Sequence, residues 1–478
     1  MIVPAMIVHV DESPVGSGKT ERAIRQVVGV PARWLIAVEK IDGVAELADR
    51  IREAARGTIT LHEIASTGPR RGHSVRQEVE AMPFRYESGH VVVICTHAAL
   101  LMSDLREFGG WHLIVDEVPN VLLMSEVQSK LDATFFETHY ALAHVHGPWS
   151  EVNLTEAGKR IDGSDLQQDD SHRHLRMFHQ RVADAERTAR PVVCNLRCWG
   201  DMRQPDLQWT WWSLFSVRQL AAFATVRFLG NGFMNSVSAK MMQRWEPDVQ
   251  WVTRSTPGDR PLISRSVLVR YFSPDRRASK NLFESPKGQT ALTAIAAYIA
   301  ADAPSDRFIW SSNDVMRRLL ARHLPAERRL APRQAGTDSW MHCTHAAMIY
   351  AAKPSENVKS VLRAVSVTED EWISTNEREA ILQFVTRTSI RDVASAEPAT
   401  VYVFAKDQAD YLMAFFEQQP HMHAASEFID LGLDLAFEKP GPKVRARASE
   451  EVSNTMAERR KRKAQYERDR RARLKVTT

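Results

Sequence analysis

The sequence predicts an α/β protein built from two domains with mainly parallel sheets. Short apolar runs alternate with amphipathic segments along most of the chain, as in sheets whose strands are buried on both faces. The pattern weakens and becomes polar between residues 128 and 206, and a second alternating series begins near residue 260. A chain of 478 residues also exceeds what a single hydrophobic core usually organises.

We assign the first domain to residues 1–258. Strands are predicted at residues 6–10, 34–38, 90–95, 111–115 and 222–230, and helices at residues 21–28 and 44–55. The polar stretch is predicted to be an insertion, about residues 125–206, that contains some helices. Trp209, Trp211 and Trp212 follow it, and aromatic residues at this density pack in a core more often than they stack on bases.

We assign the second domain to residues 259–437. Strands are predicted at residues 267–272, 307–310 and 400–404, and helices at residues 290–301, 315–323, 377–386 and 408–417. Residues 346–352 fit a helix or a strand equally well. This half therefore repeats the alternation of the first half.

A basic tail, residues 438–478, ends the sequence. Fourteen Lys or Arg residues stand there against six Asp or Glu residues, whereas the net charge of the whole chain is only +4. Pro440-Gly441-Pro442 marks a linker before these charges. The tail is either a solvated helix or disordered segment, or an arm that contacts nucleic acid.

Composition narrows the class of protein. The hydrophobic share of 44% and the charged share of 26% are ordinary for a soluble globular protein. No apolar run reaches membrane-spanning length, and the N-terminus lacks the pattern of a secretion signal. Four cysteines are too few for a disulfide framework, so we expect a cytoplasmic protein without a membrane partner.

The segment Ser13-Pro14-Val15-Gly16-Ser17-Gly18-Lys19-Thr20 predicts a nucleotide-binding loop between a strand and a helix. Its glycines allow backbone N–H groups to turn toward phosphates, Lys19 supplies a cation, and Thr20 offers a hydroxyl to Mg²⁺. Ser13 stands where a glycine is usual. The alternative is a chance Gly-Ser turn before a helix.

Asp116 and Glu117 end the strand predicted at residues 111–115. In a sheet that also carries a phosphate-binding loop, Asp116 can join the Mg²⁺ shell and Glu117 can orient or deprotonate the attacking water. The alternative is an acidic pair on the surface.

A third group, Gln383, Arg387 and Arg391, recurs every four residues, which predicts one face of a helix. The two arginines could counter charge that develops on a γ-phosphoryl group. A solvated helix face is the alternative.

Three segments, SPVGSGKT at 13–20, VDEVP at 115–119 and QFVTRTSIR at 383–391, resemble motifs I, II and VI of superfamily 2 (DEAD/DEAH-like) helicases. Weaker similarities fall in the family's order at residues 35–38 (motif Ia), 96–100, 223–225 (motif III), 308–313 (motif IV) and 336–340 (motif V). The resemblance spans roughly residues 6–417, and the subgroup is unassigned because Pro119 and Thr386 depart from the family pattern.

The resemblance implies two RecA-like domains that bind ATP and Mg²⁺ in the cleft between them and couple ATP hydrolysis to movement along nucleic acid. We expect DNA rather than RNA as this nucleic acid. Lys19, Thr20, Asp116 and Glu117 would come from the first domain. The second domain would supply the glutamine and the two arginines of the third group.

Two other functions stay open. A phage-type packaging ATPase also begins with such a loop and an Asp-Glu strand, but it would need a nuclease domain with clustered acidic residues. A nucleotide-gated nucleic-acid-binding protein would not unwind its partner. Protein partners could bind the insertion or the basic tail.

Overall fold

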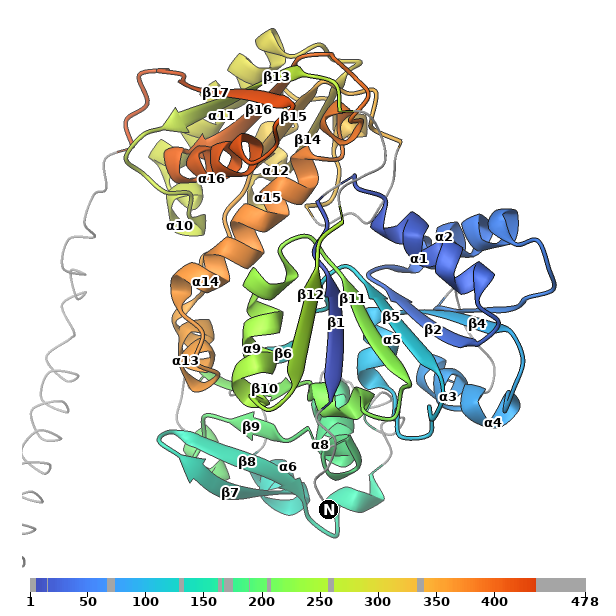
Figure 1. Cartoon of the computed structure of the whole chain (residues 1–478). Coiled ribbons are helices and arrows are strands. Elements are labelled where there is room, and N and C mark those ends of the chain that lie inside the picture. The colour runs from blue at the N-terminus through green and yellow to red at the C-terminus, as the bar shows by residue number, and fades with distance from the viewer. Residues whose placement is uncertain are drawn as a thin grey trace, which may run out of the picture. The chain divides into compact units, whose positions relative to one another are not determined.

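The computed structural model describes residues 6–14, 16–66, 74–128, 133–161, 166, 175–188, 190–203, 208–256, 262–332 and 339–435. The chain divides into two compact units, Met1–Leu433 and Asp434–Thr478. The predicted basic tail lies outside the described residues. Three sheets lie within the described part of the first unit (Figure 1).

The N-terminal sheet has seven strands in the order β12-β1-β11-β5-β2-β4-β3, and every neighbouring pair is parallel. Its strands are β1 (Ile7–Asp11), β2 (Arg33–Val38), β3 (Thr60–Ile64), β4 (Val91–Thr96), β5 (His112–Asp116), β11 (Thr225–Leu229) and β12 (Gln250–Arg254). The five predicted strands of this half are confirmed. The edge strands β3 and β12 were not predicted, because their mostly exposed or half-buried side chains interrupt the apolar run.

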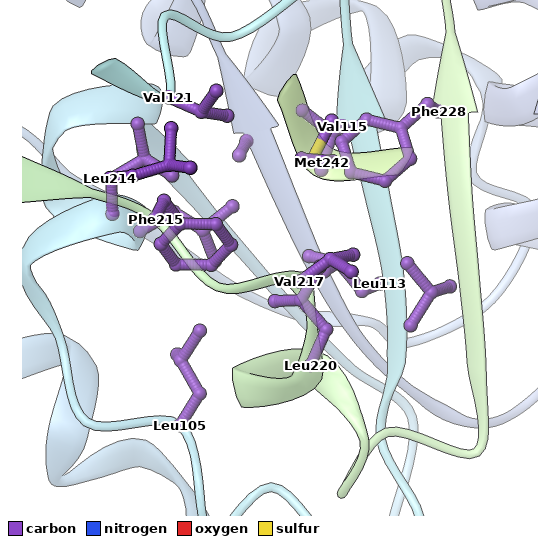
Figure 2. Close-up of a cluster of buried hydrophobic side chains, with 14 of the residues drawn as sticks. Leu105, Leu113, Val115, Val121, Leu214, Phe215, Val217, Leu220, Phe228 and Met242 are labelled. Atoms are coloured by element: carbon purple, nitrogen blue, oxygen red, sulfur yellow. The ribbon is translucent and has the colours of Figure 1, made fainter. Parts of the chain in front are cut away.

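Helices cover both faces of this sheet. They are α1 (Lys19–Gly29), α2 (Ile41–Ala54), α3 (Val75–Glu80), α4 (Met82–Arg85), α5 (His97–Met102) and α9 (Val237–Trp245). On one face α1 and α2 bury an apolar stripe against β2 and β4. On the other face Leu113 and Val115 of β5, Phe228 of β11 and Met242 of α9 belong to one buried cluster (Figure 2). Burial of each such side chain stabilises the fold by roughly 1.5–3 kcal/mol.

The insertion contains the expected helices, α6 (Ala133–His139) and α8 (Arg176–Thr188), but its centre is an antiparallel sheet that was not predicted. The strand order is β6-β10-β9-β8-β7, with β6 (Leu122–Gln128), β7 (Tyr140–His146), β8 (Trp149–Leu154), β9 (Val192–Cys194) and β10 (Gln208–Leu214). The sheet therefore extends past residue 206. Trp209 and Trp211 of β10 pack in the insertion's own core and Trp212 in the N-terminal core, which confirms their predicted packing role.

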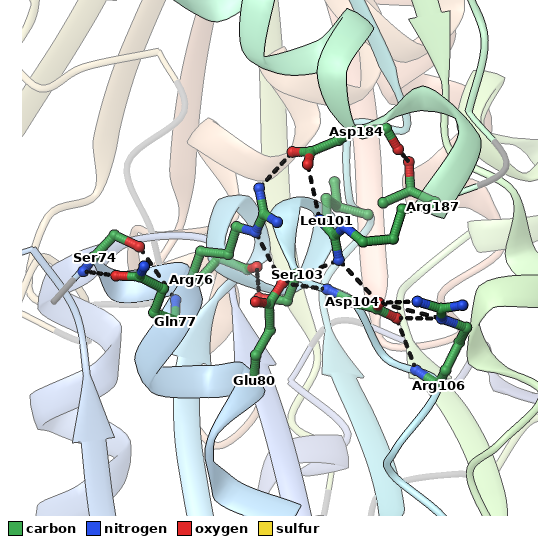
Figure 3. Close-up of polar contacts among 12 residues, drawn as sticks. Ser74, Arg76, Gln77, Glu80, Leu101, Ser103, Asp104, Arg106, Asp184 and Arg187 are labelled. Atoms are coloured by element: carbon green, nitrogen blue, oxygen red, sulfur yellow. Dashed lines mark hydrogen bonds and ion pairs between the residues drawn. The ribbon is translucent and has the colours of Figure 1, made fainter. Parts of the chain in front are cut away.

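Ion pairs attach the insertion to the N-terminal half (Figure 3). Arg76 of α3 binds Asp184 of α8 and donates to Glu80 at 2.8 Å. Arg187 of α8 lies 2.9 Å from Asp104, which follows α5. Because these pairs share partners, they form a network that fixes the position of α8.

The C-terminal sheet is wholly parallel, in the order β14-β15-β16-β13-β17. Its strands are β13 (Arg265–Ser273), β14 (Phe308–Ser312), β15 (His345–Ile349), β16 (Ala399–Ala405) and β17 (Met422–Phe428), with helices α10 (Lys280–Glu284), α11 (Pro286–Asp302), α12 (Asp314–Leu320) and α16 (Lys406–Glu417). The three predicted strands are confirmed, and residues 346–352 mostly form β15. The edge strand β17 was not predicted.

A helical arm from the second half packs on the first half. It consists of α13 (Glu356–Ala364), α14 (Glu369–Ile373), a π-helical segment (Ser374–Arg378) and α15 (Glu379–Val385), and Figure 1 shows its first part beside α9. Val361 and Leu362 of α13 belong to the N-terminal core cluster. The carboxylate of Glu371 lies 2.9 Å from Arg244 and 3.2 Å from Lys240, both on α9.

The predicted domain boundaries stay a prediction, since residue 258 lies in the segment 257–261 outside the described residues. None of the helices in the described part of the chain combines the length and apolar character that a bilayer crossing requires.

Candidate functional site

Three neighbouring strands of the N-terminal sheet end at one site. The carboxyl ends of β1, β11 and β5 lead into residues 12–18, residues 230–232 and Glu117 respectively. Ligands of parallel α/β sheets bind at such carboxyl ends, where loops and helix N-termini converge.

The predicted nucleotide-binding loop joins β1 to α1, as its motif requires. Gly16 has a φ of 77° and Gly18 a φ of 76°, a left-handed backbone that favours glycine. Lys19 and Thr20 open α1, while Pro14 and Ser17 complete the described part of the loop. Val15 lies outside the described residues.

Ser13 can replace the usual glycine because its backbone is not left-handed, unlike that of Gly16 or Gly18. Its side chain is fully buried and makes three contacts. The Ser13 hydroxyl donates to the Asp11 carboxylate and accepts from Arg22 Nη2 at 2.9 Å and from the Thr256 backbone N–H at 2.8 Å. Ser13 therefore ties the loop to β1, to α1 and to the segment after β12.

Lys19, Thr20 and Asp116 lie close together. Thr20 Oγ1 donates to Asp116 Oδ2 at 3.2 Å, and Lys19 Nζ donates to the Ser13 and Pro14 carbonyl oxygens at 2.7 and 3.1 Å. Burial lowers the pKa of Lys19, and the carboxylates of Glu117 and Asp116 oppose this shift. The ammonium thus lies close to the acidic pair.

The Asp116 carboxyl group is in surroundings that disfavour its ionised form, which a nearby cation would stabilise. Burial and the charge of Glu117 raise the pKa of Asp116 to about 7, against the opposing effects of Thr20 and Lys19. A hydroxyl and a carboxylate oxygen are ligands that Mg²⁺ prefers, and a divalent cation would favour the ionised form. Thr20 and Asp116 therefore fit the predicted Mg²⁺ site.

Glu117 has a strained backbone. Its φ is 70°, in the left-handed region that costs a non-glycine residue about 1–2 kcal/mol. A hydrogen bond from its backbone N–H to the Leu229 carbonyl, 2.8 Å long, holds this conformation. Strain of this kind is typical of functional sites, and it directs Glu117 into a cavity rather than along the strand.

His97 supports the same turn and was not singled out from the sequence. Its Nε2 lies 2.8 Å from the Asp116 carbonyl oxygen, to which the ring N–H donates. Burial lowers the pKa of His97 to about 4, so the ring is neutral at neutral pH. Its place at the start of α5, within residues 96–100, was the available signal.

Gln383, Arg387 and Arg391 do not share one helix, so that prediction is wrong. The helix α15 ends at Val385, and Arg391 lies in a separate 3₁₀ turn at Ser389–Arg391. Spacing of four residues reveals helical phase but not where a helix ends. Gln383 and Arg387 nevertheless contact each other, because Arg387 Nε donates to the Gln383 carbonyl oxygen at 3.2 Å.

Arg387 is buried, and Glu117 and Glu39 are among its charged neighbours. Its side chain is 7% exposed, and its Nη1 has no hydrogen-bond partner among the described residues. Burial lowers the pKa of Arg387, whereas the charges of Glu117 and Glu39 raise it. A buried guanidinium nitrogen without a partner is costly and fits an anionic ligand.

The backbone of Arg391 lies against the nucleotide-binding loop. A Cβ atom placed on Gly16 would stand 3.2 Å from the Arg391 carbonyl oxygen. The two halves of the chain thus meet at the loop, and the close approach gives Gly16 a second reason to be glycine.

A cavity of about 500 Å³ opens beside this meeting point. Glu117, Pro119 and Asn231 line it from the N-terminal half, and Glu379 and Gln383 line it from α15. Asn231 and Glu379 are site residues that sequence reasoning missed, although Glu379 continues the four-residue spacing backward from Gln383.

The segment compared with motif III lies at the wrong end of its strand. Thr225 begins β11 and its hydroxyl lies 2.8 Å from Nδ1 of His112, at the amino end of β5. Asp116 and Glu117 are at the opposite edge, beside Gly230 and Asn231. The comparison matched residue types, whereas position along the strand decides which residues reach the site.

Comparisons with known proteins support the fold. No protein-family model matches the chain, and no curated protein matches it. The solved structure named "XPD_Helicase" matches with a TM-score of 0.50 at 10% identity, covering 89% of this chain and 96% of the other. The structure named "XPD_APO" also gives 0.50 at 10% identity, covering 88% and 97%. The chain therefore has the fold predicted from its motifs, two RecA-like domains with mainly parallel sheets.

Proposed function

We propose that this chain hydrolyses ATP and couples hydrolysis to movement along, or unwinding of, a nucleic acid. The observation that carries the proposal is the meeting of the two halves at the nucleotide-binding loop. Arg391 approaches Gly16, and Arg387 is buried with Glu117 among its charged neighbours. A site assembled from two domains responds to nucleotide by opening and closing, which is the requirement for a motor.

Each residue has a chemical role in this proposal. Backbone N–H groups of residues 16–18 and the Lys19 ammonium hold the ATP phosphates at the N-terminus of α1. Thr20 and Asp116 would hold Mg²⁺, which would neutralise phosphate charge. Glu117 accepts the proton of the attacking water, and Arg387 donates to the γ-phosphoryl oxygens as their charge grows. Gln383 orients the water from the cavity side.

The nucleic-acid partner is supported by the motif resemblance, by the likeness in fold and by the charge of residues 438–478. Basic residues that neutralise phosphates give affinity that is independent of base sequence and sensitive to salt. We propose DNA rather than RNA as the partner, and a cytoplasmic location.

The test is ATP hydrolysis by the full chain with and without single-stranded DNA or RNA. We expect nucleic acid to stimulate hydrolysis, Lys19→Ala to remove ATP binding, and Glu117→Gln to bind ATP without turnover. If the rate of ATP hydrolysis is the same with and without nucleic acid, the chain is not a nucleic-acid motor, and an ATPase with another function is favoured. A fully active Glu117→Gln protein would show that Glu117 is not the catalytic carboxylate.

A further inference from the structure

Glu379 occupies a special point of the helical arm. It is the first residue of α15, and its backbone N–H donates to the Ser374 carbonyl, five residues earlier, which closes the π-helical segment. Such π segments interrupt α-helices at functional sites more often than elsewhere. The side chain of Glu379 lines the cavity that also contains Glu117.

Contacts from both halves of the chain surround the Glu379 carboxyl group. Gln383 Nε2 lies 3.5 Å from its Oε1, and the Tyr411 hydroxyl donates to its Oε2 at 3.1 Å. Burial raises the pKa of Glu379 to about 7; the charge of Glu117 adds to this shift, while hydrogen bonds from Tyr411, Gln383 and Asn231 oppose it. Asn231 comes from the N-terminal half.

Among the described residues that line the cavity, the Glu379 carboxyl group has no cationic partner. None of the described residues that line the cavity is Lys or Arg, whereas Glu12, Glu39 and Glu117 line it together with Glu379. Placing a carboxyl group in a cavity that other carboxyl groups also line costs free energy that an apolar or amide side chain would avoid. The placement is explained if Gln383 needs this particular partner.

We propose that Glu379 is a positioning residue that fixes the side chain of Gln383, one helical turn away, on the Glu117 side of the cavity. The inference rests on the proposed hydrolysis and deepens it. Tyr411 donates to Glu379 from α16, and Asn231 lines the same cavity from the N-terminal half, so the Glu379 carboxyl group lies where the two halves meet. The nucleotide itself is held by other residues, the loop and Lys19.

The test is a double-mutant cycle on ATP hydrolysis in the presence of single-stranded DNA. Glu379→Ala is expected to lower kcat about 10-fold, as loss of a supporting contact does, with KM for ATP unchanged within about twofold. Because Glu379 acts through Gln383, adding Glu379→Ala to Gln383→Ala should lower kcat no further. A merely structural role would not produce this non-additivity.

The matched control is Glu369→Ala, on the same arm but exposed and paired with Lys359. It should leave kcat and KM unchanged. If Glu379→Ala does not fold in a melting assay, Glu379→Met replaces it in the same cycle. Methionine keeps a similar length but removes both acceptor oxygens, so the expected result is the same. Additive losses, or an unchanged kcat in Glu379→Ala or Gln383→Ala, would overturn the inference.

The same assays distinguish a failure of the proposed function from a failure of the inference about Glu379. If the wild-type chain hydrolyses no ATP, or if Lys19→Ala hydrolyses it normally, the site assignment itself falls and this inference falls with it. If Lys19→Ala is inactive while Glu379→Ala is normal, only the role of Glu379 is refuted.

Discussion

Two effects should make Gly16→Ala unfavourable in the nucleotide-binding loop: strain of the left-handed backbone and a steric clash with the Arg391 carbonyl oxygen. Gly16 and Gly18 have almost the same left-handed φ, 77° and 76°, so alanine at either position costs about 1–2 kcal/mol of backbone strain. Their surroundings differ. A Cβ on Gly16 meets the Arg391 carbonyl oxygen at 3.2 Å, whereas the nearest atom to a Cβ on Gly18 is Glu21 Cβ at 3.9 Å. Gly18→Ala, in the same phosphate-binding loop and with the same backbone strain, is therefore the control for the contact with Arg391.

The expected result follows from this difference. Both variants should melt lower than the wild type, by roughly 2–4 °C per kcal/mol of strain. Only Gly16→Ala pushes Arg391 away from the loop, and a backbone oxygen cannot rotate aside as a side chain can. Loss of about 1.4 kcal/mol of transition-state stabilisation corresponds to a tenfold lower kcat, so Gly16→Ala should be about tenfold slower than Gly18→Ala. Melting curves and steady-state ATP hydrolysis measure both. Equal kcat values for the two variants would refute the idea that Arg391 must approach the loop.

Three further predictions concern Ser13, Glu371 and Arg387. Ser13→Gly restores the common residue but loses all three side-chain contacts, so it should lower the melting temperature by an amount equivalent to about 1–3 kcal/mol without raising activity; a more stable or more active variant would contradict this. For Glu371, burial opposes ionisation, but hydrogen bonds from Arg244 and Lys240 lower its pKa to about 2. Its contribution to stability is therefore present above the unfolded pKa near 4.5 and lost as the pH falls toward 2. The melting-temperature gap between wild type and Glu371→Gln should shrink over that range, and a gap independent of pH would exclude this ion pair as its cause. Arg387→Ala should lower kcat by about 10³-fold or more, and Arg387→Lys should not rescue it because lysine lacks the planar fork; a modest loss in either variant would remove Arg387 from the site.

The part of the site nearest the loop was predictable because its determinants are local. Strand, loop and helix follow one another within residues 7–29, and the left-handed positions are marked by Gly16 and Gly18. The Asp-Glu pair is likewise marked by a single apolar run that ends at it. These signals depend on neighbours in sequence, so they can be identified without knowledge of the fold.

Other parts of the molecule depend on distant contacts and left no such signal. The insertion sheet pairs β6 with β10 and β8 with β9 across long polar stretches, so no alternation was apparent. The end of α15 at Val385 places Arg391 by its backbone rather than by a helical face. Packing of the arm on α9 joins residues more than a hundred positions apart, such as Glu371 and Arg244.

The two α/β halves and the loop between β1 and α1 could be predicted from the sequence, because periodicity and glycine conformation are properties of short segments. The tolerance of serine at position 13 depends on a distant contact, since its hydroxyl accepts from the backbone N–H of Thr256, which is far along the chain but follows β12, the neighbour of β1. The placement of Glu379 and Asn231 in the same cavity as Glu117 likewise depends on distant contacts. Such pairings arise when distant segments close on one another, and the free energy of that closure depends on the whole packed core rather than on any local pattern.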